Sequence, residues 1–126
     1  MKSALNSAIL VPAMAAIMAV CSTVAVADEP GEKTFKKHCT ACHTVEKGKN
    51  KIGPSLAGII GRKAGSVEGF KYSEANIKSE VVWDEAKLEV YLEDPKKFMP
   101  GNKMVFNGVK NADERKEIIA YLKAAK

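Results

Sequence analysis

The sequence predicts an all-α domain whose helices are separated by long loops. Apolar residues recur at the i, i+3, i+4 spacing of one helix face in residues 85–93 and 112–125. No segment shows the sustained period-2 alternation that is typical of a half-buried strand. Glycines and a proline are concentrated in residues 44–72, which indicates a loop there. A small helical domain with such long loops needs an additional core to fold around.

Two helical segments are expected in the first half of the domain. The first covers about residues 29–38, with Asp28 as a candidate cap and Phe35 on its apolar side. After the loop over residues 44–72, residues 73–78 can form one or two helical turns.

A third helix is expected over about residues 85–93, where Asp84 can act as the N-cap. One face of this helix carries the apolar residues Leu88, Tyr91 and Leu92. Pro95 follows at the point where the helix is expected to stop. Residues 96–110 are then expected to form a loop.

The last helix is expected over about residues 112–125. Asn111 followed by Glu114 resembles a capping box at its start. Its apolar stripe consists of Ile118, Tyr121, Leu122 and Ala125.

Residues 1–27 have the features of a secretory signal peptide. Lys2 precedes a charge-free apolar run, and Ala25 and Ala27 fit an A-x-A cleavage site. The run is short for a membrane span of about 20 residues, so cleavage is favoured over a retained anchor. The mature chain is expected to begin at Asp28 and to work outside the cytoplasmic membrane.

Residues 28–126 are expected to form one small domain, a size that often needs help from an extra core or cross-link. The chain is moderately basic, with 20 Lys and Arg against 15 Asp and Glu and a formal net charge of +5. No basic run is interleaved with aromatic residues and no nucleic-acid motif is present, so nucleic-acid binding is not expected. The charge favours an acidic partner surface or an anionic membrane.

The segment Cys39-Thr40-Ala41-Cys42-His43 carries the strongest chemical signal in the chain. Two cysteines that flank two residues, with a histidine directly after them, form the attachment motif of a c-type haem. The thiols can add across the haem vinyl groups, and His43 can offer an imidazole nitrogen to the iron. The motif therefore predicts one haem c that is covalently attached through Cys39 and Cys42.

Three other roles of a C-x-x-C pair fit the sequence less well. A zinc site needs further ligands, and the candidates are Cys21, which lies in the predicted leader, and His38. A redox dithiol would follow a strand, and no strand pattern precedes Cys39. A disulfide between the two cysteines would suit an oxidising compartment but leaves His43 unexplained.

The sixth ligand of the iron decides between electron transfer and catalysis. Methionine sulfur raises the reduction potential and keeps other ligands out. Met99 and Met104 both lie in the late loop, and composition does not choose between them because methionine is often core filler. His38 is tethered next to Cys39 and cannot easily reach the opposite face, so it is expected to be an exposed titratable group.

Many further residues occur in an order and at a spacing that are specific when taken together. They are Gly31, Phe35, Cys39 to Gly48, Gly53, Pro54, Gly61, Arg62, Lys63, Trp83, Tyr91 to Lys97, Pro100, Gly101, Lys103, Met104, Phe106 and Ile119 to Lys123. With this pattern, residues 28–126 resemble a class I cytochrome c, close to mitochondrial cytochrome c and bacterial cytochrome c2. The resemblance implies the small all-α fold of that family, with helices and long loops wrapped around one covalent haem c.

The resemblance also assigns the axial ligands. It implies that the metal ligands are His43 and Met104, and that Met99 is not one. It further implies that the Pro54 carbonyl accepts a hydrogen bond from His43, which fixes the imidazole ring and makes it a better donor.

Other haem-pocket residues follow from the resemblance. Tyr72 and Trp83 align with residues that hydrogen-bond the haem propionates, with Arg62 nearby. Polar groups lining the pocket correspond to Asn76 and Tyr91, and an aromatic side chain covering the haem edge corresponds to Phe106.

Two positions depart from the family pattern. Asn102 occupies a position where the family commonly has a threonine in a small internal polar network. His38 occupies a position where a basic residue often precedes the first haem cysteine, which makes a pH-dependent contact face an expectation here.

The function implied by the resemblance is that of a soluble, monomeric periplasmic electron carrier, and not an enzyme. Electrons would come from a membrane cytochrome bc complex and pass to a terminal oxidase or a photosynthetic reaction centre. The family steers acidic partners with lysines around the haem edge. The candidates here are Lys37, Lys51, Lys96, Lys97, Lys103 and Lys110.

Two alternatives to a free carrier are compatible with a c-type haem motif. One is the cytochrome subunit of a larger oxidoreductase. The other is a haem peroxidase or gas-binding protein, which needs an open sixth position and a distal histidine or arginine. After the predicted leader the histidines are His38 and His43, and neither suits the distal role.

Overall fold

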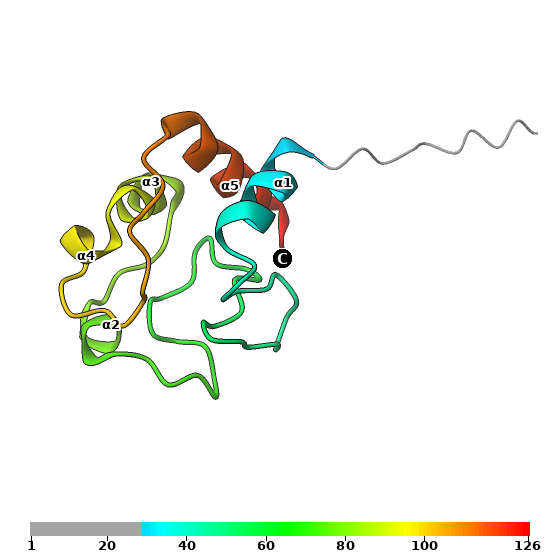
Figure 1. Cartoon of the computed structure of the whole chain (residues 1–126). Helices are drawn as coiled ribbons and strands as arrows, with labels where there is room; N and C mark the ends of the chain where they lie inside the picture. The colour runs from blue at the N-terminus through cyan, green and yellow to red at the C-terminus, as the bar shows by residue number, and fades with distance from the viewer. Residues whose placement is uncertain (1–28) are drawn as a thin grey trace, which may run out of the picture.

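The computed structural model describes residues 29–126, so the predicted leader and the candidate cap Asp28 lie outside the described residues. The described chain forms five helices, drawn in Figure 1: α1 (Pro30–His38), α2 (Glu74–Lys78), α3 (Glu85–Glu93), α4 (Pro95–Phe98) and α5 (Ala112–Ala124). Within these residues, strand pairing is limited to an isolated antiparallel bridge between Lys63 and Val82. The all-α prediction is confirmed.

The two terminal helices, α1 and α5, pack directly against each other (Figure 1). Gly31 allows this close crossing, because a Cβ built on it would lie 2.5 Å from the carbonyl oxygen of Glu117. Thr34 Oγ1 donates a hydrogen bond of 2.5 Å to Glu117 Oε2. The rings of Phe35 and Tyr121 lie next to this contact, with centroids 5.1 Å apart.

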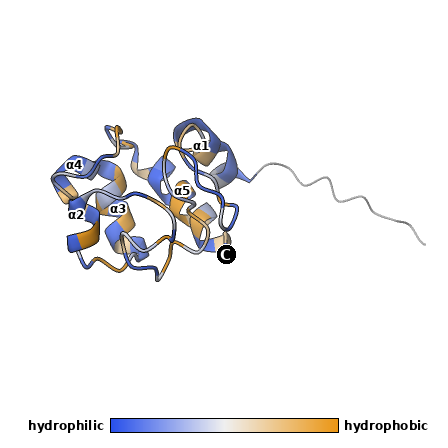
Figure 2. Cartoon of the chain, turned by 90° about the horizontal axis from the view of Figure 1, so that it is seen from below, coloured by the Kyte–Doolittle hydropathy of each residue, from blue (hydrophilic) through white to orange (hydrophobic). Residues whose placement is uncertain are grey.

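Helix α3 has the bounds that the sequence predicts. The Asp84 side chain caps it by accepting a hydrogen bond of 2.7 Å from the Lys87 N–H. Leu88 and Leu92 are buried, and Tyr91 packs against the core from the same face. Figure 2 shows such apolar positions as separate stripes on largely hydrophilic helices.

Helix α4 corrects the prediction of an uninterrupted loop over residues 96–110. Pro95 ends α3, but it also occupies the first turn of α4, where a missing N–H has no cost. The Asp94 side chain caps the new helix through a hydrogen bond of 3.1 Å from the Lys97 N–H. A proline that stops one helix here starts the next.

The start of α5 has half of the predicted capping box. Asn111 Oδ1 accepts hydrogen bonds from the N–H groups of Asp113 and Glu114, at 2.9 and 3.1 Å. The Glu114 carboxylate turns away to α1, where it lies 2.6 Å from Lys37 Nζ and 3.0 Å from His38 Nε2. The Glu114 side chain therefore bonds to α1 and not to the N–H of Asn111, as a complete capping box would require.

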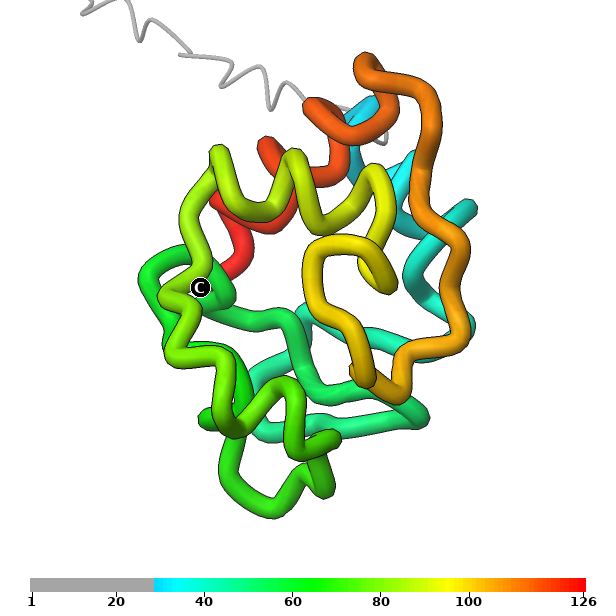
Figure 3. Tube along the Cα trace, turned by 90° about the vertical axis from the view of Figure 1, so that its left-hand side faces the viewer, coloured from blue at the N-terminus to red at the C-terminus, as the bar shows by residue number. Residues whose placement is uncertain are grey.

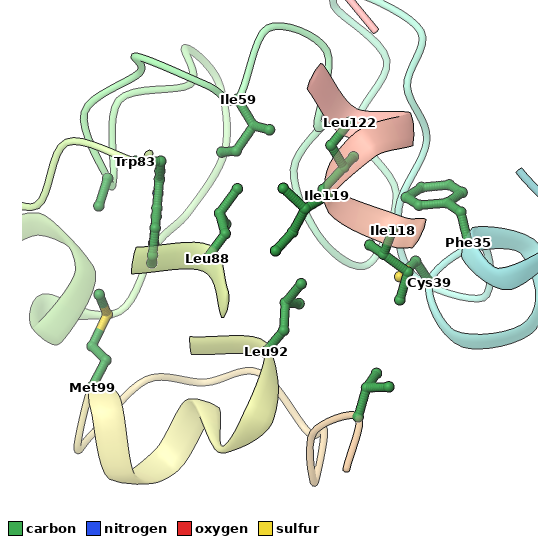
Figure 4. Close-up of a cluster of buried hydrophobic side chains, with 12 residues drawn as sticks. Phe35, Cys39, Ile59, Trp83, Leu88, Leu92, Met99, Ile118, Ile119 and Leu122 are labelled. Atoms are coloured by element: carbon green, nitrogen blue, oxygen red, sulfur yellow. The ribbon is translucent and has the colours of Figure 1, made fainter. Parts of the chain in front are cut away.

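The buried apolar side chains come from α1, α3 and α5 and from the loops between them. Figure 4 shows Leu88, Leu92, Ile118, Ile119 and Leu122 facing a common interior, with Ile59 and Trp83 supplied by loops. Figure 3 shows the segment after α4 running along one edge of the molecule back to α5. The long loops therefore close around the interior that the helices begin to form.

Candidate haem site

The C-x-x-C-H segment is folded into a turn at the end of α1. The Cys39 N–H donates to the Phe35 carbonyl at 2.8 Å, and the Cys42 and His43 N–H groups donate to the Cys39 carbonyl at 3.1 and 2.8 Å. Cys39 is buried and Cys42 half-buried, and both thiols are free. This turn presents both sulfur atoms and the imidazole to one cavity.

The His43 ring is fixed by the loop beneath it. Its Nδ1 lies 2.8 Å from the Pro54 carbonyl oxygen, so the structure contains the hydrogen bond that the family resemblance implies. Since a carbonyl only accepts, Nδ1 carries the proton and Nε2 keeps its lone pair for a metal. Burial lowers the pKa of the imidazole, which also favours the neutral ring that a metal ligand must have.

Every residue that the sequence analysis predicts for the site lines one cavity of about 320 Å³. Its walls include Cys39, Cys42, His43, Pro54, Arg62, Tyr72, Asn76, Trp83, Tyr91, Met104 and Phe106. Most of the remaining lining is apolar, which suits a large flat cofactor with a hydrocarbon body. Two thiols, an imidazole and a thioether are the kinds of group that attach and ligate a haem c, so the residues present fit that cofactor.

The two methionines of the late loop lie in different environments. Met99 is 4% exposed and belongs to the core, on the opposite side of the buried cluster from Cys39 in Figure 4. Met104 lines the cavity, and its Sδ lies 3.9 Å from the Tyr91 hydroxyl, within hydrogen-bond range for sulfur. Burial raises the pKa of Tyr91 to about 12, so the hydroxyl stays protonated and can donate.

The polar side of the cavity contains Arg62, Tyr72 and Trp83. The Arg62 guanidinium donates to the carbonyls of Ala57 and Ser55, both at 3.0 Å, and has no carboxylate partner within residues 29–126. Burial lowers its pKa, which an anionic group nearby would oppose. A half-buried cation without an acidic partner is consistent with a site for a haem propionate.

The hydroxyl of Tyr72 accepts a hydrogen bond of 3.1 Å from the Val67 N–H. This leaves the hydroxyl proton of Tyr72 available to the cavity. Asn76 directs its backbone N–H and its Nδ2 to the hydroxyl oxygen of Ser73, at 3.2 and 3.1 Å. These bonds hold the side chain of Asn76 at the cavity wall.

Two alternative roles of the cysteine pair find little support in the site. Burial and the neighbouring Cys42 raise the pKa of Cys39 to about 12, whereas a redox dithiol needs a thiol with a lowered pKa. Within residues 29–126, no group of three or more His, Cys, Asp and Glu side chains could hold a metal ion, so the zinc alternative lacks a ligand set there.

The prediction that His38 is exposed is wrong. Its side chain is 21% exposed, and its Nε2 lies against Glu114 on α5. Hydrogen bonds from Lys37 and His38 lower the pKa of the Glu114 carboxyl. Lys37 and His38 on α1 and Glu114 on α5 therefore form a polar link between the two helices.

Several apolar residues complete the lining without having been predicted for the site. They are Ile52, Leu56, Ile59, Phe70, Leu88 and Leu92. The ring of Phe70 packs edge-on against Tyr72, with centroids 4.8 Å apart. Leu88 and Leu92 have a helix-spaced apolar pattern that predicts burial, but it does not distinguish the core from a cofactor pocket.

No helix among the described residues is long and apolar enough to cross a membrane.

The described part of the chain is similar in sequence to known proteins. The family model described as cytochrome c matches residues 29–126. The chain is 57% identical over 100 residues to cytochrome c2 iso-2 of Magnetospirillum molischianum, which covers 79% of this chain and 100% of that protein. It is 54% identical to cytochrome c of Gibberella zeae over 94 residues (74% of this chain, 89% of the relative). It is also 54% identical to cytochrome c of Chlamydomonas reinhardtii over 96 residues (75% and 86%).

Proposed function

We propose that this chain, which belongs to the class I cytochrome c family and is a haem c electron-transfer protein, carries single electrons in the periplasm. The donor would be a membrane cytochrome bc complex, and the acceptor a terminal oxidase or a photosynthetic reaction centre. The observation that carries the proposal is that His43 and Met104 line the same cavity as both cysteines.

The residues of the site divide the work of holding the cofactor. Cys39 and Cys42 would each add across one vinyl group, with the sulfur bonding to one carbon and the thiol hydrogen going to the other. His43 Nε2 and Met104 Sδ would ligate the iron, and the Pro54 carbonyl and the Tyr91 hydroxyl would hold these two groups in place. When bound, haem c supplies a one-electron couple between Fe(III) and Fe(II).

We propose an electron carrier and not an enzyme because two ligands of the haem iron would both come from the protein. With His43 and Met104 both bound, no position remains for peroxide or a diatomic gas. The other histidine of the described residues, His38, is hydrogen-bonded to Glu114 and so does not act as a distal histidine. The test is the visible spectrum of the purified holoprotein, for which we expect a low-spin c-type spectrum in both redox states. A high-spin resting spectrum would favour the peroxidase or gas-binding alternative.

We place the docking face around the opening of the cavity. Lys103 lines the cavity next to Val105, which is 97% exposed, and Lys51 precedes Ile52, which is 79% exposed. An apolar centre with a cationic rim suits a transient complex with an acidic partner.

The other candidate lysines differ in their surroundings. Lys37 pairs with Glu114, and Lys110 Nζ donates to the Glu93 carbonyl at 2.6 Å. Lys37 and Lys110 are both exposed and keep their charge in these contacts, so both can still act in long-range steering. The short helix α4 carries the two remaining candidates, Lys96 and Lys97.

The steering proposal is tested by association kinetics with an acidic redox partner. Lys103→Glu should slow association and flatten its dependence on salt. Lys123→Glu is the matched control, because it makes the same change of charge at a residue that does not line the cavity. Equal effects of the two variants would contradict the placement of the docking face.

Residues 1–27 are proposed as a cleaved leader and residues 28–126 as the mature domain. The mass of the protein from a periplasmic fraction should correspond to a chain that begins at Asp28 and lacks Cys21. Sedimentation of that material should give a monomer. Purification in a stable complex with another polypeptide would instead support a subunit of a larger oxidoreductase.

A further inference from the structure

The side chain of Asn102 joins the end of α4 to the backbone of Met104. Its Nδ2 donates hydrogen bonds to the carbonyls of Pro95 and Met99, at 2.9 and 2.8 Å. Its Oδ1 accepts a hydrogen bond of 2.9 Å from the Met104 N–H. Both donors of this half-buried amide are therefore used, and its oxygen holds Met104.

The three hydrogen bonds are not equally replaceable. The Pro95 carbonyl also accepts from the Met99 N–H at 3.0 Å, and the Met99 carbonyl accepts from the Asn102 N–H at 3.2 Å. Among the described residues, the Met104 N–H has Asn102 Oδ1 as its one partner. Loss of the amide would therefore leave the Met104 N–H without its hydrogen-bond partner among the described residues.

Little else restrains this part of the loop. Gly101, Lys103 and Val105, the neighbours of Asn102 and Met104, are exposed. The remaining polar contacts of Met104 are the long hydrogen bond from Tyr91 to Sδ and a bond of 3.0 Å from the Phe106 N–H to its carbonyl. Neither of these bonds ties the loop to α4.

We infer that Asn102 is a positioning residue that holds the loop of residues 99–104 closed, so that Met104 keeps competing ligands from the sixth position. The inference rests on the proposed role of Met104 as a ligand. A competing ligand can bind only when the loop is open, so its apparent affinity is its intrinsic affinity reduced by the open fraction. Asn102 sets that fraction through the hydrogen bonds it makes.

The test is a titration of the ferric holoprotein with imidazole, followed in the visible spectrum. Asn102→Ala should lower the apparent Kd for imidazole about tenfold. This is the ratio expected when the closed loop loses the net free energy of about one hydrogen bond relative to the open loop. Asn102→Thr should lower it about threefold, because a hydroxyl can accept from the Met104 N–H but has one donor instead of two.

Asn111→Ala is the matched control. Asn111 also accepts two backbone N–H groups, but it caps α5 and is not a cavity residue. This variant should lose stability while its Kd for imidazole stays within twofold of the wild-type value. A Kd within twofold of wild type in Asn102→Ala would overturn the inference, as would an equal decrease in Asn111→Ala.

Amide hydrogen exchange gives a second measurement, which does not need the alanine variant to fold. The Met104 N–H of the wild-type holoprotein should exchange about threefold more slowly than in Asn102→Thr, the same factor as in the imidazole titration. Equal rates in the two proteins would overturn the inference. Failure of the underlying ligand assignment has a different signature: Met104→Ala would then keep the wild-type spectrum and the wild-type Kd for imidazole.

Discussion

The imidazole ring of His43 lies directly against the backbone of Gly53. A Cβ built on Gly53 would come within 2.3 Å of His43 Cε1 and within 2.8 Å of both ring nitrogens. The next residue, Pro54, accepts the hydrogen bond from Nδ1. Gly53 therefore limits how closely the His43 ring approaches this loop, and Pro54 fixes the orientation of the ring.

Gly53→Ala should move the His43 ring, because no rotation of a methyl group relieves a contact to the ring itself. We expect a loss of about 1–3 kcal/mol in the free energy of unfolding, together with a changed haem spectrum. Denaturant unfolding and visible spectroscopy of the holoprotein measure both effects.

Gly58→Ala is the control for this substitution. Gly58 has a positive φ of 65° but no atom within 4 Å of a built Cβ, so its variant has backbone strain without a clash. It should lose about 1 kcal/mol and keep the wild-type spectrum. Identical spectra in the two variants would contradict the proposed role of Gly53.

Glu114 should make the stability of the protein depend on pH. Because hydrogen bonds from Lys37 and His38 lower the pKa of this carboxyl in the fold, its contribution is fully present above the unfolded pKa near 4.5. The contribution is lost as the pH falls through the lowered folded-state value. Glu114→Gln should therefore be less stable than wild type at about pH 7, and the difference should shrink in acid. A difference that stays constant down to about pH 2 would show that the carboxylate charge is not responsible.

Tyr91→Phe should lower the reduction potential. With Met104 as the proposed iron ligand, the Tyr91 hydroxyl would draw electron density from Met104 Sδ, and its removal would make the sulfur a better donor to Fe(III). A weak hydrogen bond of about 0.5–1 kcal/mol corresponds to a decrease of about 20–40 mV for one electron. A redox titration gives the value, with Tyr121→Phe as the control because Tyr121 packs on Phe35 and is not a cavity residue. An unchanged or higher potential would argue against this contact.

Arg115 should be needed for stability although no chemistry is assigned to it. This buried side chain pairs with Glu89 at 2.6 Å and donates to the carbonyls of Val109 and Lys110, at 2.8 and 3.1 Å. Arg115→Ala should cost about 3 kcal/mol, because it leaves these acceptors without their donor. Thermal unfolding measures the loss, and the exposed neighbour Lys116 provides the control, with Lys116→Ala expected within about 0.5 kcal/mol of wild type. Similar losses in both variants would contradict this role.

Local signals explain why most of the helices were predictable from the sequence. Asp84 and Asn111 each cap a helix through their own side chains, and those bonds depend on residues two or three positions away. Helix α4 differs from the predicted loop because Pro95 is also a favourable first residue of a helix, and Asp94 directly before it is a cap residue. The sequence contained this signal too.

Interactions between distant segments could not be predicted in the same way. The Glu114 carboxylate bonds to residues of α1 that lie 76 and 77 positions away along the chain. Burial of Arg115 runs against the usual exposure of arginine, and only its three acceptors explain it. The cysteines and His43 were predictable from the spacing of their motif. The remaining site residues, Met104 included, needed the family resemblance, since their own types also suit a core.

The near-infrared spectrum of the oxidised holoprotein tests the assignment of Met104 as an iron ligand most directly. A methionine sulfur bound to Fe(III) gives a weak charge-transfer band in this region. We predict that Met104→Ala abolishes the band, while Met99→Ala, a change in the core, retains it. Retention of the band in Met104→Ala, or its loss in Met99→Ala alone, would contradict the assignment.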